Sequence, residues 1–128
     1  MTLLIKSFDS PFYFNSVELV ANIRIEYNYE TEPPDIHFES KEEESDYLWK
    51  FQSGEYINIW LIVKASCLGE IGFNTLGQVH ILANDVDDQI DQTIESHEMV
   101  KYALNSLEEN ISFKIKLLEE KLGLKFIK

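Results

Sequence analysis

The chain has 128 residues, and 23 acidic residues against 11 basic ones give it a formal net charge of −12. Hydrophobic residues make up 45% of the sequence, which is ordinary for a globular protein and suits a single domain spanning residues 1–128. This charge argues against nucleic acid or an anionic membrane as a partner, because both need a basic surface. No apolar run approaches the roughly 18–20 residues that a membrane-spanning helix requires.

The acidic residues are concentrated in the middle of the chain. Residues 1–25 are balanced, residues 26–98 hold 17 acidic residues and three lysines, and residues 99–128 carry a small positive excess. Cys67 is the single cysteine, so an intrachain disulfide is excluded, and residues 1–9 lack the apolar length of a signal peptide. We therefore expect a cytoplasmic protein with one strongly acidic region.

Residues 17–29 alternate apolar and polar side chains, which is the period-two pattern of a strand with one buried face. A short strand at 36–38 and another at 47–51 are expected to follow, with the charged loop 41–46 between them. Residues 56–67 are apolar on both faces, which predicts a central strand covered on both sides. Weaker strands at 71–75 and 78–83 complete an antiparallel meander of about five to six strands within residues 1–83.

The hydrophobic period changes after residue 90. From Val100 to Leu122, seven apolar residues follow one another at spacings of four, three, four, four, three and four. This spacing places them on one stripe of a helix, and we expect a long helix over residues 93–122. The predicted fold class is α+β, with this C-terminal helix packed across one face of the antiparallel sheet.

Three aromatic residues, Phe12, Tyr13 and Phe14, stand side by side near the N-terminus. Neighbouring residues in a strand point to opposite faces of the sheet. At least one of these rings is therefore expected to be exposed or covered by a partner.

The sequence offers no constellation of residues that predicts catalysis, a cofactor or a metal. No nucleophile elbow or phosphate-binding loop is present, and Cys67 has no basic residue beside it in the sequence. His37, His80 and His97 share no ligand spacing. Residues 87–98 imitate a calcium-binding loop, but Gln92 stands where the turn needs glycine, so calcium binding is a minor alternative. We expect a non-enzymatic protein without cofactor or metal.

Binding to a basic protein is the function that the composition favours. Carboxylates interleave with aromatic residues in the central tract, and a second acidic segment precedes the C-terminal helix, a combination that suits steered protein association. The predicted partner-binding residues are Glu26, Glu30, Glu32, Asp35, Glu39, Glu42, Glu43, Glu44, Asp46, Trp49, Asp85, Asp87, Asp88 and Asp91.

By charge and size the chain resembles bacterial immunity proteins, which neutralise a cognate toxin. The leading hypothesis is an inhibitor that covers the basic surface of a partner, most specifically a nuclease toxin. A mimic of DNA that inhibits a DNA-binding enzyme is a third hypothesis, although the slightly basic C-terminal helix counts against it. The sequence leaves open whether the chain forms homo-oligomers.

Residues 57–82, INIWLIVKASCLGEIGFNTLGQVHIL, support a second hypothesis. With Phe73 and Gly77 before the last strand, this stretch resembles the strand region of SecB-type export chaperones, which are small, acidic and tetrameric. The resemblance implies four antiparallel strands followed by helices. It also implies binding of unfolded chains on exposed apolar strand surfaces.

Overall fold

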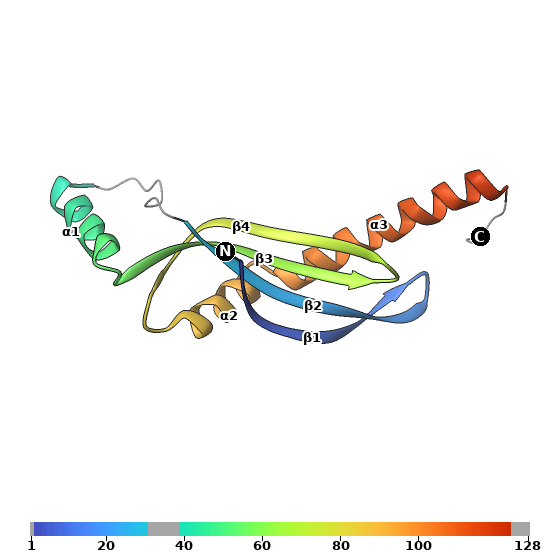
Figure 1. Ribbon diagram of the computed structural model, residues 1–128, viewed down its shortest axis with the longest axis horizontal. Helices are drawn as coiled ribbons and strands as arrows, with labels where there is room; N and C mark the ends of the chain where they lie inside the picture. The colour runs from blue at the N-terminus through green and yellow to red at the C-terminus, as the bar shows by residue number, and fades with distance from the viewer. Residues whose placement is uncertain (1, 31–38, 124–128) are drawn as a thin grey trace.

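The computed structural model describes residues 2–30 and 39–123 and shows an α+β fold built on one antiparallel sheet (Figure 1). The sheet has four strands in the order β1-β2-β3-β4. The elements, in chain order, are β1 (Thr2–Phe14), β2 (Val17–Glu30), α1 (Lys41–Gln52), β3 (Tyr56–Cys67), β4 (Glu70–Leu82), α2 (Val86–Ser96) and α3 (Met99–Leu122). The predicted fold class, an antiparallel sheet with a C-terminal helix packed on it, is confirmed.

The four strands are fewer than the five to six expected. Ile36 and Phe38, which were expected to form a short strand, lie outside the described residues. The two weak strands predicted at 71–75 and 78–83 are one strand, β4, which continues through an irregularity in its pairing with β3. Gln78 takes a φ of +54° there, and Trp60 of β3 lies opposite this extra residue. A bulge of this kind lets a strand continue while its sequence pattern shifts by one residue.

The prediction of a charged loop at 41–46 and a strand at 47–51 was wrong, because these residues form α1. Ser40 caps the helix, and its Oγ accepts a hydrogen bond of 3.1 Å from the backbone N–H of Glu43. Carboxylates at Glu42, Glu43 and Glu44 then stabilise the positive N-terminal end of the helix. The alternation of Tyr47, Trp49 and Phe51 was therefore not a strand pattern.

The predicted helix over 93–122 is two helices. α2 begins at Val86, earlier than expected, and α3 begins at Met99. Glu98 has a φ of +49°, and this left-handed residue turns the chain between the two helices. α3 then runs without interruption to Leu122, and Gly123 ends it with a φ of +65°.

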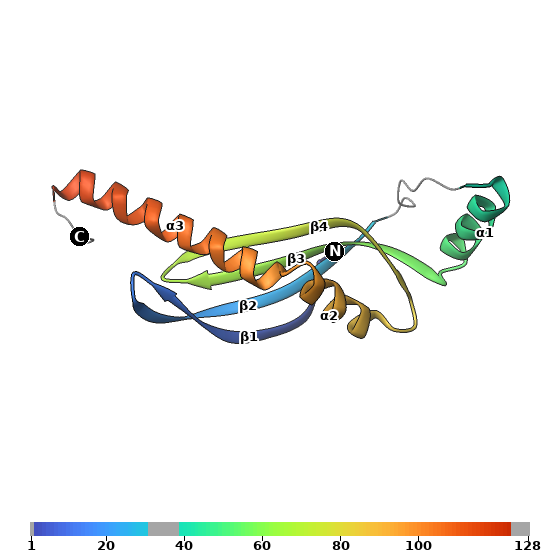
Figure 2. The same ribbon diagram turned by 180° about the vertical axis from the view of Figure 1, so that it is seen from behind.

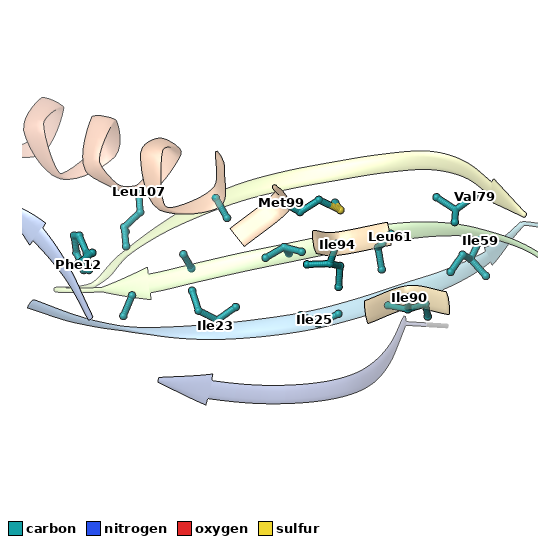
Figure 3. Close-up of a cluster of buried hydrophobic side chains, with 14 of the residues drawn as sticks. Phe12, Ile23, Ile25, Ile59, Leu61, Val79, Ile90, Ile94, Met99 and Leu107 are labelled. Atoms are coloured by element: carbon teal, nitrogen blue, oxygen red, sulfur yellow. The ribbon is translucent and has the colours of Figure 1, made fainter. Parts of the chain in front are cut away.

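The core lies between one face of the sheet and the two C-terminal helices (Figure 3). Ile23, Leu61 and Val63 supply the sheet side, and Ile90 and Leu107 supply the helix side; all five are fully buried. The alternation in β2 and β3 therefore marks the buried face as predicted. The other face of β3 is only partly covered, since Trp60 is 43% exposed, so the expectation that both faces are buried was wrong.

The molecule is elongated, and helices extend from opposite ends of the sheet (Figures 1 and 2). α1 stands beyond the end where β2 finishes and β3 begins, and none of its residues is buried. The C-terminal part of α3 projects past the opposite end. Within the described residues, no helix is long and apolar enough to cross a membrane.

Candidate protein-interaction surface

Tyr47 and Lys50 of α1 contact the sheet. The ring of Tyr47 stacks on Tyr56 of β3, with 5.4 Å between ring centroids, and meets the ring of His80 edge-on at 5.9 Å. Burial raises the pKa of the Tyr47 phenol above its usual value. Lys50 lies 5.6 Å from the centre of the Tyr56 ring and 3.4 Å from the Asp46 carboxylate, which raises the pKa of Lys50. These contacts hold the C-terminal half of α1 in place.

The rest of α1 faces solvent. Trp49 is 65% exposed, and Glu42, Glu43 and Glu44 are exposed in the first turn. A shallow hollow of about 410 Å³ lies along one side of the helix, lined among others by Glu44, Leu48 and Trp49. An exposed indole beside carboxylates combines two features of protein interfaces, an aromatic anchor and charge.

The beginning of α2 brings a second set of carboxylates to this end of the molecule. Asp85, Asp87 and Asp88 are exposed where the chain leaves β4. A backbone hydrogen bond of 2.9 Å from Ala83 to Glu55 ties this segment to the residues just before β3. We use the name acidic end for the exposed carboxylates just before and within the first turns of α1 and α2, which are Glu39, Glu42, Glu43, Glu44, Asp85, Asp87 and Asp88.

Glu26, which was predicted to bind a partner, lies on the sheet face opposite the helices, where its side chain is largely covered by neighbouring residues. Its residue surface is 5% exposed, and its carboxylate lies 2.9 Å from Lys64 Nζ and 3.2 Å from Arg24 Nε. The hydrogen bond from Lys64 is the main reason why the pKa of Glu26 is below its ordinary value. Two cations within the protein already neutralise this carboxylate, which sets Glu26 apart from the exposed carboxylates of α1.

Three other predicted carboxylates already contact side chains of this protein, and two predicted residues lie outside the described part of the chain. Glu30 accepts a hydrogen bond of 3.2 Å from the Asn58 side chain, and Asp46 pairs with Lys50. Asp91 lies 2.8 Å from Lys6 Nζ in a half-exposed ion pair between α2 and β1. Glu32 and Asp35 lie outside the described residues. The structure thus brings together half of the predicted set, together with Trp49, at the acidic end.

The sheet face opposite the helices exposes apolar side chains that were not among the predicted site residues. We call it the open face. It displays Trp60, Ile71 and Phe73, each between 43% and 48% exposed, around the Arg24–Glu26–Lys64 cluster. The sequence contained an indication of this face, because residues 56–67 carry apolar side chains on both sides of the strand. Apolar side chains on the second side must either be buried by another element or form an exposed apolar patch.

No group of three or more metal-ligating side chains comes together anywhere in residues 2–30 and 39–123. The segment that imitates a calcium loop is helical over most of its length as α2, so its side chains do not follow a loop around an ion. Gln89, at the third position of that imitation, instead binds the backbone of Leu82 and Asp85.

Comparison of the chain with protein-family models, with curated protein sequences and with solved structures found no match.

Proposed function

We propose that the protein acts without catalysis, by binding another polypeptide, and that its acidic end receives a basic protein. The observation that carries this proposal is α1 itself. This twelve-residue helix contributes no buried residue to the core, yet it is capped and held in a defined position while it exposes Trp49 and three adjacent glutamates. A helix that adds nothing to the core is well suited to presenting a surface to a partner.

The most specific form of this proposal is an immunity protein that covers a nuclease toxin. Because a nuclease binds phosphates, its substrate site is basic, and an acidic protein can occupy that site and exclude the nucleic acid. Carboxylates concentrated at one end of an elongated molecule orient it as it approaches such a site. The association rate should therefore fall as ionic strength rises.

Affinity purification with the full-length protein as bait tests the proposal. The wild type should recover one basic protein, and the variant Glu42→Lys/Glu43→Lys/Glu44→Lys should lose it. A matched control, Glu18→Lys/Glu95→Lys/Glu120→Lys, changes the net charge equally at exposed positions elsewhere and should retain the partner. Equal recovery of the partner by both triple variants would contradict the role of α1.

A second candidate is binding of unfolded chains, as the resemblance to SecB-type chaperones implies. The open face supports it, because Trp60, Ile71 and Phe73 offer apolar area on an unobstructed stretch of sheet. In an aggregation assay with a chemically unfolded client, the wild type would then keep the client soluble, and Trp60→Ser/Phe73→Ser would not. The triple lysine variant of α1 would behave like the wild type in this assay, which separates the two candidates.

A further inference from the structure

A hollow of about 670 Å³ lies between the β1–β2 turn and α3, well away from the acidic end. Residues from both elements line it, among them Tyr13 and Phe14 of β1 and Glu108, Glu109, Phe113 and Lys116 of α3. Its volume is in the range of sites that hold a small molecule or several residues of a peptide. Phe14 packs against the core, but Tyr13 and Phe113 are not part of the core cluster, so the core does not explain their presence at the hollow.

Tyr13 and Phe113, which line the hollow, are the two most exposed large hydrophobic side chains in the described residues. Tyr13 is 69% exposed because strand alternation turns its neighbour Phe12 into the core, and this confirms the expectation that one ring of the aromatic run is exposed. Phe113 is 70% exposed on the side of α3 that faces away from the buried stripe. When a ligand covers an exposed aromatic ring, apolar surface is removed from water, and this lowers the free energy of the complex.

The side chains that line the hollow carry a net negative charge. Glu108 and Glu109 have no ion-pair partner within the described part of the chain, whereas Glu70, nearer the β3–β4 turn, pairs with Lys114 at 3.1 Å. Lys116 is the one basic side chain that lines the hollow. Two carboxylates against one ammonium group favour a ligand with positive charge.

We propose that this hollow binds an arginine side chain within an extended basic segment of another polypeptide. Arginine satisfies both features of the hollow at once, because its planar guanidinium donates paired hydrogen bonds to carboxylates and stacks on aromatic faces. Glu108 and Glu109 would accept the hydrogen bonds, and Tyr13 and Phe113 would contact the guanidinium and the flanking residues. The site is separate from α1, so it stands whether or not the acidic end binds a partner.

Fluorescence anisotropy with a short fluorescein-labelled peptide of alternating glycine and arginine tests the site. The variant Glu108→Gln/Glu109→Gln should weaken binding by about tenfold or more, as expected for the loss of charge-assisted contacts. Phe113→Ala and Tyr13→Ala should each weaken it several-fold. Lys116→Gln should strengthen binding, which is a result that a purely structural role for this region would not produce.

Matched variants separate the hollow from the general attraction of an acidic protein for a basic peptide. Glu119→Gln/Glu120→Gln makes the same charge change farther along α3, and Tyr102→Ala removes a half-exposed ring from the same helix. None of these three residues lines the hollow. Equal losses in the Glu108/Glu109 and control variants would overturn the proposal. Backbone amide NMR of the complete chain should show peptide-induced shifts at residues 13–15 and 105–116. If these resonances instead shift with protein concentration alone, a second copy of the chain occupies the hollow and the proposal is wrong.

Discussion

The contact between α3 and β4 depends on the absence of a side chain at Gly72. A Cβ atom at this position would lie 2.7 Å from Leu107 Cα and would also overlap the Leu107 nitrogen and the Ala103 carbonyl oxygen. Carbon atoms in contact keep about 3.5–4.0 Å apart, so Gly72→Ala requires α3 to move by roughly 1 Å. The obstructing atoms belong to helix backbone, which cannot rotate away as a side chain can.

We expect Gly72→Ala to destabilise the protein by about 3 kcal/mol, at the upper end of the range for overpacked cores. For a domain of this size, that corresponds to a fall in the melting temperature of roughly 10 °C. Urea unfolding followed by far-UV circular dichroism measures the change in the free energy of unfolding.

Gly77→Ala is the matched control in the same strand. Its Cβ would meet the Trp60 ring at 2.6 Å, but that ring is half-exposed on the open face and can shift. Alanine also loses less conformational entropy than glycine on folding, so the net change should stay within about 1 kcal/mol. If Gly72→Ala costs no more than Gly77→Ala, α3 does not pack on β4 as described.

Three further predictions concern the ion pair, the tyrosine pair and the core. The pKa of Glu26 is lowered in the folded state, mainly by the hydrogen bond from Lys64. Its contribution to stability is therefore present above the ordinary pKa of 4.5 and is lost as pH falls through the lowered value. Glu26→Gln should remove this part of the pH dependence of urea unfolding. The hydrogen bond between the hydroxyls of Tyr27 and Tyr29 raises the pKa of Tyr27 to about 12, and in a spectroscopic titration Tyr29→Phe should return it toward 10. Leu107→Ala should lower the free energy of unfolding by about 3–5 kcal/mol, since Leu107 is fully buried.

Each of these predictions has a control. Glu18→Gln removes an exposed carboxylate and should leave the acid limb of the stability profile unchanged. Tyr13→Phe should not alter the Tyr27 titration, because Tyr13 is largely in water. Leu117→Ala, on the exposed side of α3, should cost less than about 1 kcal/mol. The ion pair would be contradicted if Glu26→Gln had the same pH profile of stability as the wild type. The tyrosine contact would be contradicted if Tyr29→Phe left the Tyr27 titration unchanged. The packing of Leu107 would be contradicted if Leu107→Ala and Leu117→Ala lowered the free energy of unfolding equally.

The sheet and its helix cover were predictable because they follow from periodicity. The alternation in residues 17–29 identifies a buried face without knowledge of its partner. The helical stripe does so only where α3 lies on the sheet: Leu107 and Ile111 are buried, whereas Leu118 and Leu122, beyond the sheet, are exposed. α1 was missed because its aromatic residues happen to alternate, although Ser40 and Glu43 form the Ser-x-x-Glu pattern that starts many helices. Capping chemistry was the better signal there.

The site residues were harder to predict because exposure depends on strand register. Glu26 and Glu42 are both acidic residues of the central tract, but Glu26 of β2 pairs with Lys64 of the neighbouring strand β3. This pairing joins residues 38 positions apart in the sequence, and no local pattern reveals it. The hollow beside α3 was missed for the same reason, since Tyr13 and Phe113 come to line one hollow only in the folded chain.

Hydrogen–deuterium exchange on the complex between this protein and the basic partner recovered by affinity purification tests the central claim most directly. If the partner binds at the acidic end, binding should slow exchange in α1, Lys41–Gln52, and at residues 85–88. The strands β3 and β4, which carry the open face, should exchange as they do in the free protein. Protection confined to β3 and β4, with α1 unchanged, would contradict the account and favour binding through the open face.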